Sequence, residues 1–262
     1  MSTVHPKDVK NFEPLEQAQE VSLPDLVAYE DGEIWKAHHF SDFANWLVPG
    51  RVLVGEYPGC KSPYRSSDEE SNGHRVRDIV VRGEVTEILC LQGEIPAQDD
   101  ESQWKESANG QLSCNGFYGY RNDAIAAARE TGLNHDGVPS FHYFPISDFR
   151  PAESLELMAD AVDRMARLVK SGKTLYIHCR AGRGRSGLFG ACLLGRLYAD
   201  MTAEDALNRI DTCFRTRMYS DGDRFQAFLQ EILASGDRRR SSPETNGQED
   251  QVRLFFQDML RR

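Results

Sequence analysis

The sequence predicts an α/β fold in which a central, mostly parallel twisted sheet is flanked by helices and the C-terminal half is helical. Two apolar segments of strand length, 141–146 and 174–178, enclose a segment whose apolar residues recur at helical spacing. A strand–helix–strand unit with a crossover this long joins parallel strands. After residue 178, each further apolar pattern has helical spacing as far as the C-terminus.

The N-terminal elements are predicted in chain order. Residues 1–40 are rich in proline and acidic residues with little periodicity, so we expect an irregular arm before a single domain at 41–262. The first strand, 51–54, follows the turn pair Pro49–Gly50. A polar loop at 58–73 and a short helix at 76–80 precede an apolar strand at 85–91.

The segment 96–139 is rich in Asp, Ser, Asn and Gly. It contains one predicted helix, 122–130, which Asn122 or Asp123 can cap. A connection of this length in a compact domain is often functional, and a solvated insertion is the alternative.

The remaining helices carry clear apolar stripes. The first of them shows spacings of 3 and 4 at Leu155, Met158, Val162, Met165 and Val169. Thr202 and Asp205 form a capping-box-like start for a later helix. Apolar patterns at 225–232 and 252–259 predict the last two helices.

Composition narrows the classes of partner. The chain has 262 residues and a formal net charge of −10, which argues against nucleic acid and against general adhesion to anionic lipid. We expect no transmembrane segment, because no apolar run reaches the ~18 residues of a spanning helix. The six cysteines contain no C-x-x-C pair, and the N-terminus lacks a signal pattern. They predict reduced thiols in the cytoplasm, with the nucleus as the alternative.

The segment 175–187, LYIHCRAGRGRSG, carries the chemistry. An apolar strand ends just before Cys179, and a Gly-rich turn leads to Arg185 and a helix. Five residues between Cys179 and Arg185 can curl into a cradle of inward-pointing backbone N–H groups, which Gly182 and Gly184 permit. The helix N-terminus and the two-donor face of Arg185 suit a tetrahedral phosphate. This environment is expected to lower the pKa of Cys179 below the ~8.5 of a free thiol and make it a nucleophile.

Asp148 is the candidate proton donor for the leaving oxygen. It follows the strand 141–146 directly, and in a parallel sheet that places it at the same carboxyl edge as Cys179. The alternative is that Asp148 caps the next helix.

The residues His178-Cys179-x5-Arg185-Ser186, with the upstream Ile146-Ser-Asp148, resemble the cysteine-based protein tyrosine phosphatase superfamily, specifically its dual-specificity-like branch. The resemblance covers about residues 45–260 in the order of elements. It implies that Cys179 forms a phosphocysteine intermediate, that Asp148 protonates the leaving group and that no metal or organic cofactor takes part. The implied phosphate-binding loop comprises Arg180, Ala181, Gly182, Arg183 and Gly184, with Arg185 binding phosphoryl oxygens and Ser186 stabilising the leaving thiolate.

Departures from the tyrosine-specific enzymes affect the outer parts of the site. The tyrosine-specific enzymes carry Trp-Pro-Asp where this chain has Ile-Ser-Asp, and their substrate-clamping aromatic loop has no clear counterpart here. Tyr118 and Tyr120 could substitute, although a surface tyrosine cluster is the favoured interpretation. Gln248 resembles their water-positioning glutamine, but a polar helix start explains it equally well. For His178 we favour an orienting role, through hydrogen bonds to the loop backbone.

Two substrate classes remain open. A phosphorylated protein is the first choice. An anionic phospholipid head group or inositol phosphate is the second, because Arg180 and Arg183 add positive charge to the loop as in the 3-phosphoinositide phosphatases. A catalytically inactive phosphoprotein-binding module is disfavoured because Cys179, Arg185 and Asp148 are all present. Sulfurtransferases and arsenate reductases share Cys-x5-Arg-like loops, but the upstream acid and Ser186 favour phosphate ester hydrolysis.

Overall fold

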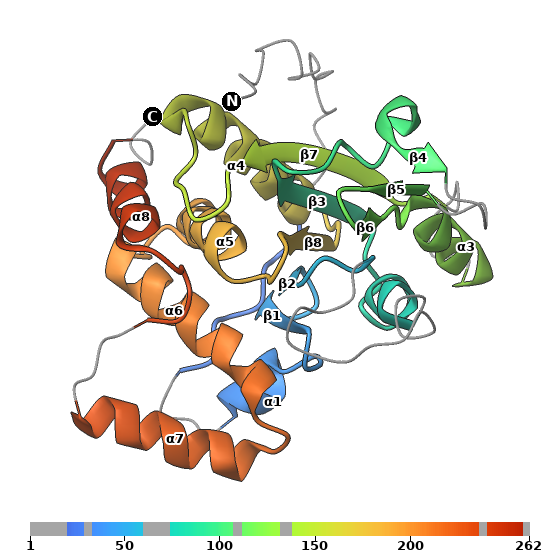
Figure 1. The fold of residues 1–262 in the computed structure, drawn as a ribbon. Helices are drawn as coiled ribbons and strands as arrows, with labels where there is room; N and C mark the ends of the chain where they lie inside the picture. The colour runs from blue at the N-terminus through green and yellow to red at the C-terminus, as the bar shows by residue number, and fades with distance from the viewer. Residues whose placement is uncertain are drawn as a thin grey trace.

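The central sheet has five strands in the computed structural model, which describes residues 20–28, 33–59, 74–106, 112–131, 138–235 and 240–258 (Figure 1). Their order across the sheet is β1-β2-β8-β3-β7. The strands are β1 (Ala44–Val48), β2 (Val52–Gly55), β3 (Glu87–Gln92), β7 (Ser140–Ile146) and β8 (Leu175–His178). β1 pairs antiparallel with β2, and the other neighbours pair in parallel, which confirms the predicted mostly parallel sheet.

The four predicted strands are present with ends shifted by one or two residues, whereas β1 was not predicted. Its five residues include Asn45 and Trp46, which weaken a simple apolar pattern. Pairing with β2 determines this strand, through a hairpin in which Gly50 adopts a φ of 67°. Tertiary pairing therefore outweighs the weak local signal here.

Helices cover both faces of the sheet (Figure 1). One face packs against α4 (Leu155–Lys170), α5 (Gly184–Leu197), α6 (Ala203–Arg215) and α8 (Asn246–Asp258), and they share the larger apolar core. The other face packs against a π-helical turn, η3 (Asp78–Arg82), and α3 (Arg121–Thr131). The predicted flanking helices are thus confirmed, and α5 contacts α4, α6 and α8 as well as the strands β2 and β8.

The predicted insertion contains more structure than one helix. Its described part adds a 3₁₀ turn and a small antiparallel sheet: η4 (Glu101–Gln103), β4 (Lys105–Glu106), β5 (Leu112–Cys114) and β6 (Phe117–Tyr118). The helix α3 starts at Arg121, so Asn122 and Asp123 lie in its first turn and the prediction that one of them caps it is wrong. Residues 107–111 and 132–137 of the insertion lie outside the described residues.

The N-terminal arm follows the domain surface where it is described. Residues 20–28 have no regular structure, and the Val21 N–H donates to Lys170 O at 2.7 Å. The arm also contains an unpredicted helix, α1 (Ile34–His38). It contacts β1, α6 and α7 (Gly222–Ser235), and Trp35 Nε1 donates to Tyr219 O, which lies between η5 (Thr216–Met218) and α7.

Parts of three further predictions fall outside the described residues, namely 1–19 and 29–32 of the N-terminal arm, 60–73 of the polar loop and the last residue of the C-terminal helix, Met259. Among the helices that the structure describes, none combines the length and apolar character needed to cross a bilayer.

Candidate active site

The loop between β8 and α5, residues 179–185, is named here the cysteine loop. It forms one wall of a cavity of about 170 Å³. Cys179 lies at this cavity and is only 3% exposed. The lining residues are Asp148, Phe149, Cys179, Arg180, Ala181, Gly184, Arg185 and Glu244. The structure therefore brings Cys179, Arg185 and Asp148 together, as the sequence predicts.

Gly182 forms the apex of the cysteine loop. Its φ of 61° lies in the left-handed region, and a Cβ atom at this position would overlap the backbone of Gly55 at the end of β2. A side chain at residue 182 would thus meet both an unfavourable φ and a steric clash. The loop can approach β2 this closely because residue 182 is glycine.

Arg185 is held by a forked ion pair that the sequence analysis missed. Its Nη1 and Nη2 atoms lie 2.5 and 2.9 Å from the two carboxylate oxygens of Glu94, and Nη1 also donates to Ile146 O at 3.2 Å. Burial lowers the pKa of Arg185, but Glu94, Cys179 and Asp148 outweigh this effect and raise it overall. The guanidinium, 2% exposed, is therefore charged and fixed in orientation.

A usable signal for Glu94 was present in the sequence. It follows a predicted parallel strand at the carboxyl end, the edge of an α/β sheet where ligands bind. The same reasoning that selected Asp148 would have selected Glu94.

Asp148 lies in the loop after β7 and reaches the same guanidinium. Its Oδ1 atom is 3.0 Å from Arg185 Nη2, and its side chain is 43% exposed. The alternative role as a helix cap is wrong, because Ser154 is the N-cap of α4 and accepts from Leu157 N. The next residue, Phe149, has a φ of 59° and exposes its ring at the cavity.

Ser186 and His178 flank the cysteine loop on its inner side. Ser186 is fully buried in the first turn of α5, and its Oγ atom has no hydrogen-bond partner within the described residues. His178 is fully buried, and its Nε2 atom lies 2.6 Å from Tyr120 Oη. Burial lowers the pKa of His178 to about 3, so the ring is neutral near pH 7.

Tyr120 is not part of a surface cluster, and that favoured prediction is wrong for this residue. It is 1% exposed, and its phenol contacts His178 behind Cys179, so it cannot clamp a substrate. Gln98 fixes this arrangement, since its Oε1 atom accepts from Tyr120 N and its Nε2 atom donates to Tyr57 Oη. The insertion therefore supports the back of the site. Tyr118 lies in β6, half-buried.

Gln248 lies at the start of α8 with its side chain buried. Its Oε1 atom accepts from the N–H groups of Glu244 and Thr245, and Nε2 donates to Arg150 O in the loop that carries Asp148. Both ends of the amide thus bind main-chain groups. This geometry links the Asp148 loop to residues 244–245, and the water-positioning role stays a prediction.

Arg183 points away from the cavity toward residues 240–244, named here the α8 lead-in. Its Nε atom donates to Ser241 O at 2.5 Å, and Nη1 lies 3.2 Å from Glu244 Oε1. Ser242 Oγ donates to Arg183 O in return. The loop that the sequence assigns to phosphate binding therefore uses Arg183 to bind its own chain.

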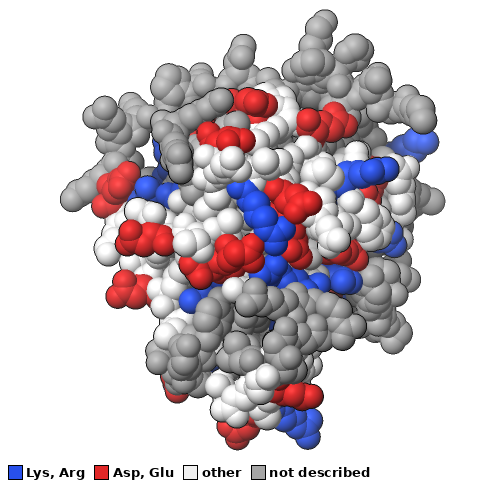
Figure 2. Space-filling model, turned by 90° about the vertical axis from the view of Figure 1, so that its left-hand side faces the viewer, with Lys and Arg blue, Asp and Glu red and all other residues white. Residues whose placement is uncertain are grey.

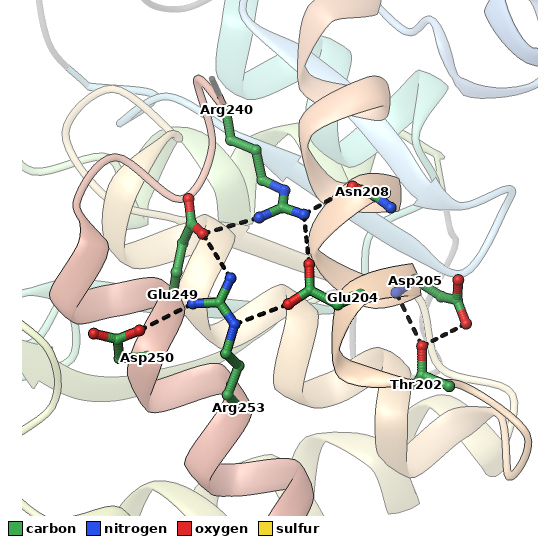
Figure 3. A network of polar contacts seen from close by, with 8 residues as sticks. All are labelled: Thr202, Glu204, Asp205, Asn208, Arg240, Glu249, Asp250 and Arg253. Carbon is green, nitrogen blue, oxygen red and sulfur yellow. Dashed lines mark hydrogen bonds and ion pairs between the residues drawn. The ribbon is translucent and has the colours of Figure 1, made fainter. Parts of the chain in front are cut away.

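The α8 lead-in is fixed at its start by an ion network between α6 and α8 (Figure 3). Arg240 donates to Glu249 at 2.9 Å, and to Glu204 at 2.8 Å and Asn208 at 2.9 Å. Arg253 contacts Glu204, Glu249 and Asp250 from the other side. We name Glu204, Asn208, Arg240, Glu249, Asp250 and Arg253 the α6–α8 network.

Arg217 supports the cysteine loop from below and was also missed. Its Nη2 atom donates to Val54 O at 2.7 Å and to Gly182 O at 3.3 Å, and Nε donates to Asn45 Oδ1 at 2.7 Å. Burial lowers its pKa to about 10, which leaves it charged near neutral pH. No local pattern marks Arg217, because its partners are 35 to 172 residues away in the sequence.

Part of the chain is similar in sequence to known phosphatases. Residues 129–249 match the family model described as PTP-SAK, Swiss Army Knife protein, DSP-PTPase phosphatase domain. A 63-residue segment is 40% identical to the phosphatidylglycerophosphate phosphatase PTPMT1 of Arabidopsis thaliana, which is 24% of this chain and 18% of that protein.

Two solved structures show partial similarity of shape. The active form of Tk-PTP has a TM-score of 0.47 and 17% identity, covering 82% of this chain and 97% of that chain. A kinase associated phosphatase with its catalytic cysteine replaced by serine has a TM-score of 0.45 and 16% identity, covering 80% and 87%.

The segment that carries Asp148, Cys179 and Arg185 is thus similar to the dual-specificity branch of the cysteine-based protein tyrosine phosphatases. The match covers residues 129–249, slightly less than half of the chain.

Proposed function

We propose that this protein is a cysteine-dependent phosphomonoester hydrolase whose substrates are phosphorylated proteins of the cytoplasm or nucleus. The observation that carries the proposal is the shared cavity of Cys179, Arg185 and Asp148, with Arg185 bound to Asp148 at 3.0 Å. A nucleophile, an anion-binding guanidinium and a carboxyl group thus meet where one phosphoryl group can fit.

The proposed reaction has two displacements at phosphorus. Cys179 Sγ attacks phosphorus, the bond to the ester oxygen breaks, and Asp148 gives its proton to that oxygen. Water then attacks the phosphocysteine, the S–P bond breaks, and Asp148 takes the proton from the water. Asp148 must leave Arg185 to do this, which happens when a phosphoryl oxygen takes its place on the guanidinium. The hydroxyl of Ser186, which has no hydrogen-bond partner in the part of the chain that the structure describes, is available to stabilise the departing thiolate.

The nucleophile is tested by Cys179→Ser, with release of p-nitrophenol from p-nitrophenyl phosphate as the measurement. We expect turnover to vanish while the circular dichroism spectrum and phosphate binding are retained. Cys114→Ser is the matched control, because Cys114 lies half-buried in β5 away from the cavity. Retained turnover in Cys179→Ser would remove the nucleophile assignment.

The acid is tested by Asp148→Ala. Turnover should fall ~10²–10⁴-fold, and the basic limb of the pH–rate profile should flatten. An unchanged profile would assign the proton to another group. Acid quenching of Asp148→Asn with ³²P-labelled substrate should trap label on Cys179, and a trapped label elsewhere would contradict the phosphocysteine step.

The alternative substrate is a phospholipid monoester. It is supported by the short identity to a phosphatase that is named for phosphatidylglycerophosphate, and by Arg180, which lines the cavity and is exposed. Phosphate release from phosphopeptides and phosphoinositides, measured in parallel with Cys179→Ser as the blank, separates the two classes.

A further inference from the structure

The three arginines of the cysteine loop have different partners. Arg185 binds Glu94 and Asp148, and Arg183 binds Ser241 O and Glu244. The structure gives Arg180 no ion-pair partner within the described residues, and its side chain is exposed at the cavity. The loop sequence alone suggests three charges facing a substrate, whereas the contacts leave Arg180 as the cation that can reach groups beyond the first phosphoryl.

Glu244 places a carboxylate on the cavity wall. Its side chain is 25% exposed and lines the cavity with Cys179 and Arg185. Its main-chain N–H donates to Gln248 Oε1 at 3.1 Å, which fixes the start of the side chain. The carboxylate is further held by Arg183, so it cannot turn away without breaking that ion pair.

The segment that carries Glu244 is itself anchored. Asp211 Oδ1 on α6 accepts from the N–H groups of Ser241 and Ser242. Arg240, at the start of the segment, is bound by the α6–α8 network (Figure 3). The position of the Glu244 carboxylate is therefore set by the fold on both sides.

The formal charges around the cysteine loop cancel. Three carboxylates oppose the three loop arginines: Glu94, Asp148 and Glu244. The first phosphoryl group is accommodated by backbone N–H groups, the α5 N-terminus and Arg185. A second phosphate beside it would lie at the cavity mouth, where the Glu244 carboxylate repels it.

We propose that Glu244 selects substrates with a single phosphoryl group, that is, singly phosphorylated peptides, and rejects polyanionic head groups. The inference rests on the proposed phosphatase activity and names the substrate class of that site. Glu244 acts in two ways: it repels a second phosphate directly, and it holds Arg183 away from the cavity.

The test uses matched peptides, one with a single phosphotyrosine and one with a phosphoserine added next to it, together with a soluble phosphatidylinositol bisphosphate. Wild-type kcat/KM should favour the singly phosphorylated peptide by about tenfold over either polyanion. Glu244→Gln should narrow this ratio by about three- to tenfold, because the repulsion is removed and Arg183 is released. Arg183→Gln should widen the ratio, because the carboxylate loses its counter-charge.

Asp250→Asn is the control, because it removes one negative charge from the neighbouring helix α8, outside the cavity, and should leave the ratio unchanged. An unchanged ratio in Glu244→Gln, or a wild type that prefers the polyanions, overturns the inference while the phosphatase activity stands. A wild type that hydrolyses none of the three overturns the proposed function and the selectivity with it.

Discussion

Two regions of this molecule use arginine and carboxylate side chains in contrasting ways. At the cysteine loop, Arg185 and Arg217 are 2% and 6% exposed and are bound by few partners at fixed positions. In the α6–α8 network, partners such as Glu204 and Asp250 are 51% and 69% exposed. Basic and acidic side chains alternate over that face of the protein (Figure 2). The network has more ion pairs, yet the buried pairs orient the groups that react.

The physical reason is the cost of leaving each group without its partner. An exposed charge that loses its partner is hydrated again, so a surface pair contributes little to stability. A buried guanidinium or acceptor has no water to replace its partner, so losing one contact displaces the others. The contrast predicts a steep order of effects among substitutions of similar size.

The largest effect is expected for Arg185→Lys. The charge is kept, but a single ammonium cannot fork to Glu94 and also present two donors to a phosphoryl group. We expect kcat to fall by about 10²–10³-fold. Steady-state hydrolysis of p-nitrophenyl phosphate measures kcat. A fall in kcat of less than tenfold would show that the positive charge alone is sufficient.

Arg217→Met is expected to follow. The substitution leaves the carbonyls of Val54 and Gly182 and the amide of Asn45 without their donor, at a cost of about 1–3 kcal/mol. We expect kcat to fall about tenfold, since a displaced cysteine loop misplaces the nucleophile. Hydrolysis of p-nitrophenyl phosphate measures kcat, and urea unfolding measures the loss of stability.

Arg209→Met is the matched control for Arg217. Arg209 is also buried in this part of the chain, but it donates to Val27 O of the N-terminal arm. Arg209→Met should lower stability without lowering kcat. Equal kcat values in wild type, Arg217→Met and Arg209→Met would reduce Arg217 to a purely structural residue.

The free energy of unfolding should also depend on pH, through two buried histidines that lie outside the α6–α8 network. Burial lowers the pKa of His38 to about 4, against 6.5 in an unfolded chain. Below pH 6.5 the unfolded chain binds a proton there and the folded one does not, so the free energy of unfolding falls as pH drops toward 4. His38 alone accounts for about 2 kcal/mol between pH 7 and pH 5.

Urea unfolding at several pH values between 7 and 5 measures how steeply the free energy of unfolding falls with pH. His38→Gln should flatten it whatever its effect at pH 7, because the titrating group is gone. His178, whose pKa burial lowers to about 3, adds a further loss in the same direction. A slope that His38→Gln leaves unchanged would contradict the assignment to this residue.

The sequence was sufficient for the parts of the site that are local in the chain. The cysteine loop could be located because strand, glycines, Arg185 and helix follow one another within 13 residues, 175–187. Asp148 could be located because a parallel sheet brings successive strand ends to one edge. Four of the five strands and most of the flanking helices followed from the hydrophobic pattern and its turn signals, whereas β1 did not.

The missing parts depend on contacts across long sequence separations. Glu94 lies 91 residues from Arg185, and Tyr120 lies 58 residues from His178. Arg183, by contrast, was assigned a ligand contact because of its place in the loop. Its actual partners lie 58 or more residues later in the sequence. Spacing gives the order of groups along the chain, whereas packing decides which of them face the cavity.

The smallest effect is expected in the α6–α8 network. Hydrogen bonds from Arg253, and then from Arg240, lower the pKa of Glu204 although burial opposes them. A carboxylate with a lowered pKa adds stability above its unfolded pKa of 4.5, and this added stability is lost as pH falls through the folded pKa.

Because Glu204 is half exposed, Glu204→Gln should cost at most about 1 kcal/mol at pH 7 and a few degrees in Tm. The loss should shrink in 1 M salt, where exposed charges are screened, and kcat should stay unchanged. A salt-insensitive loss, or a fall in kcat, would mean that Arg240 cannot hold the α8 lead-in through Glu249 and Asn208 alone, so that the two regions act as one.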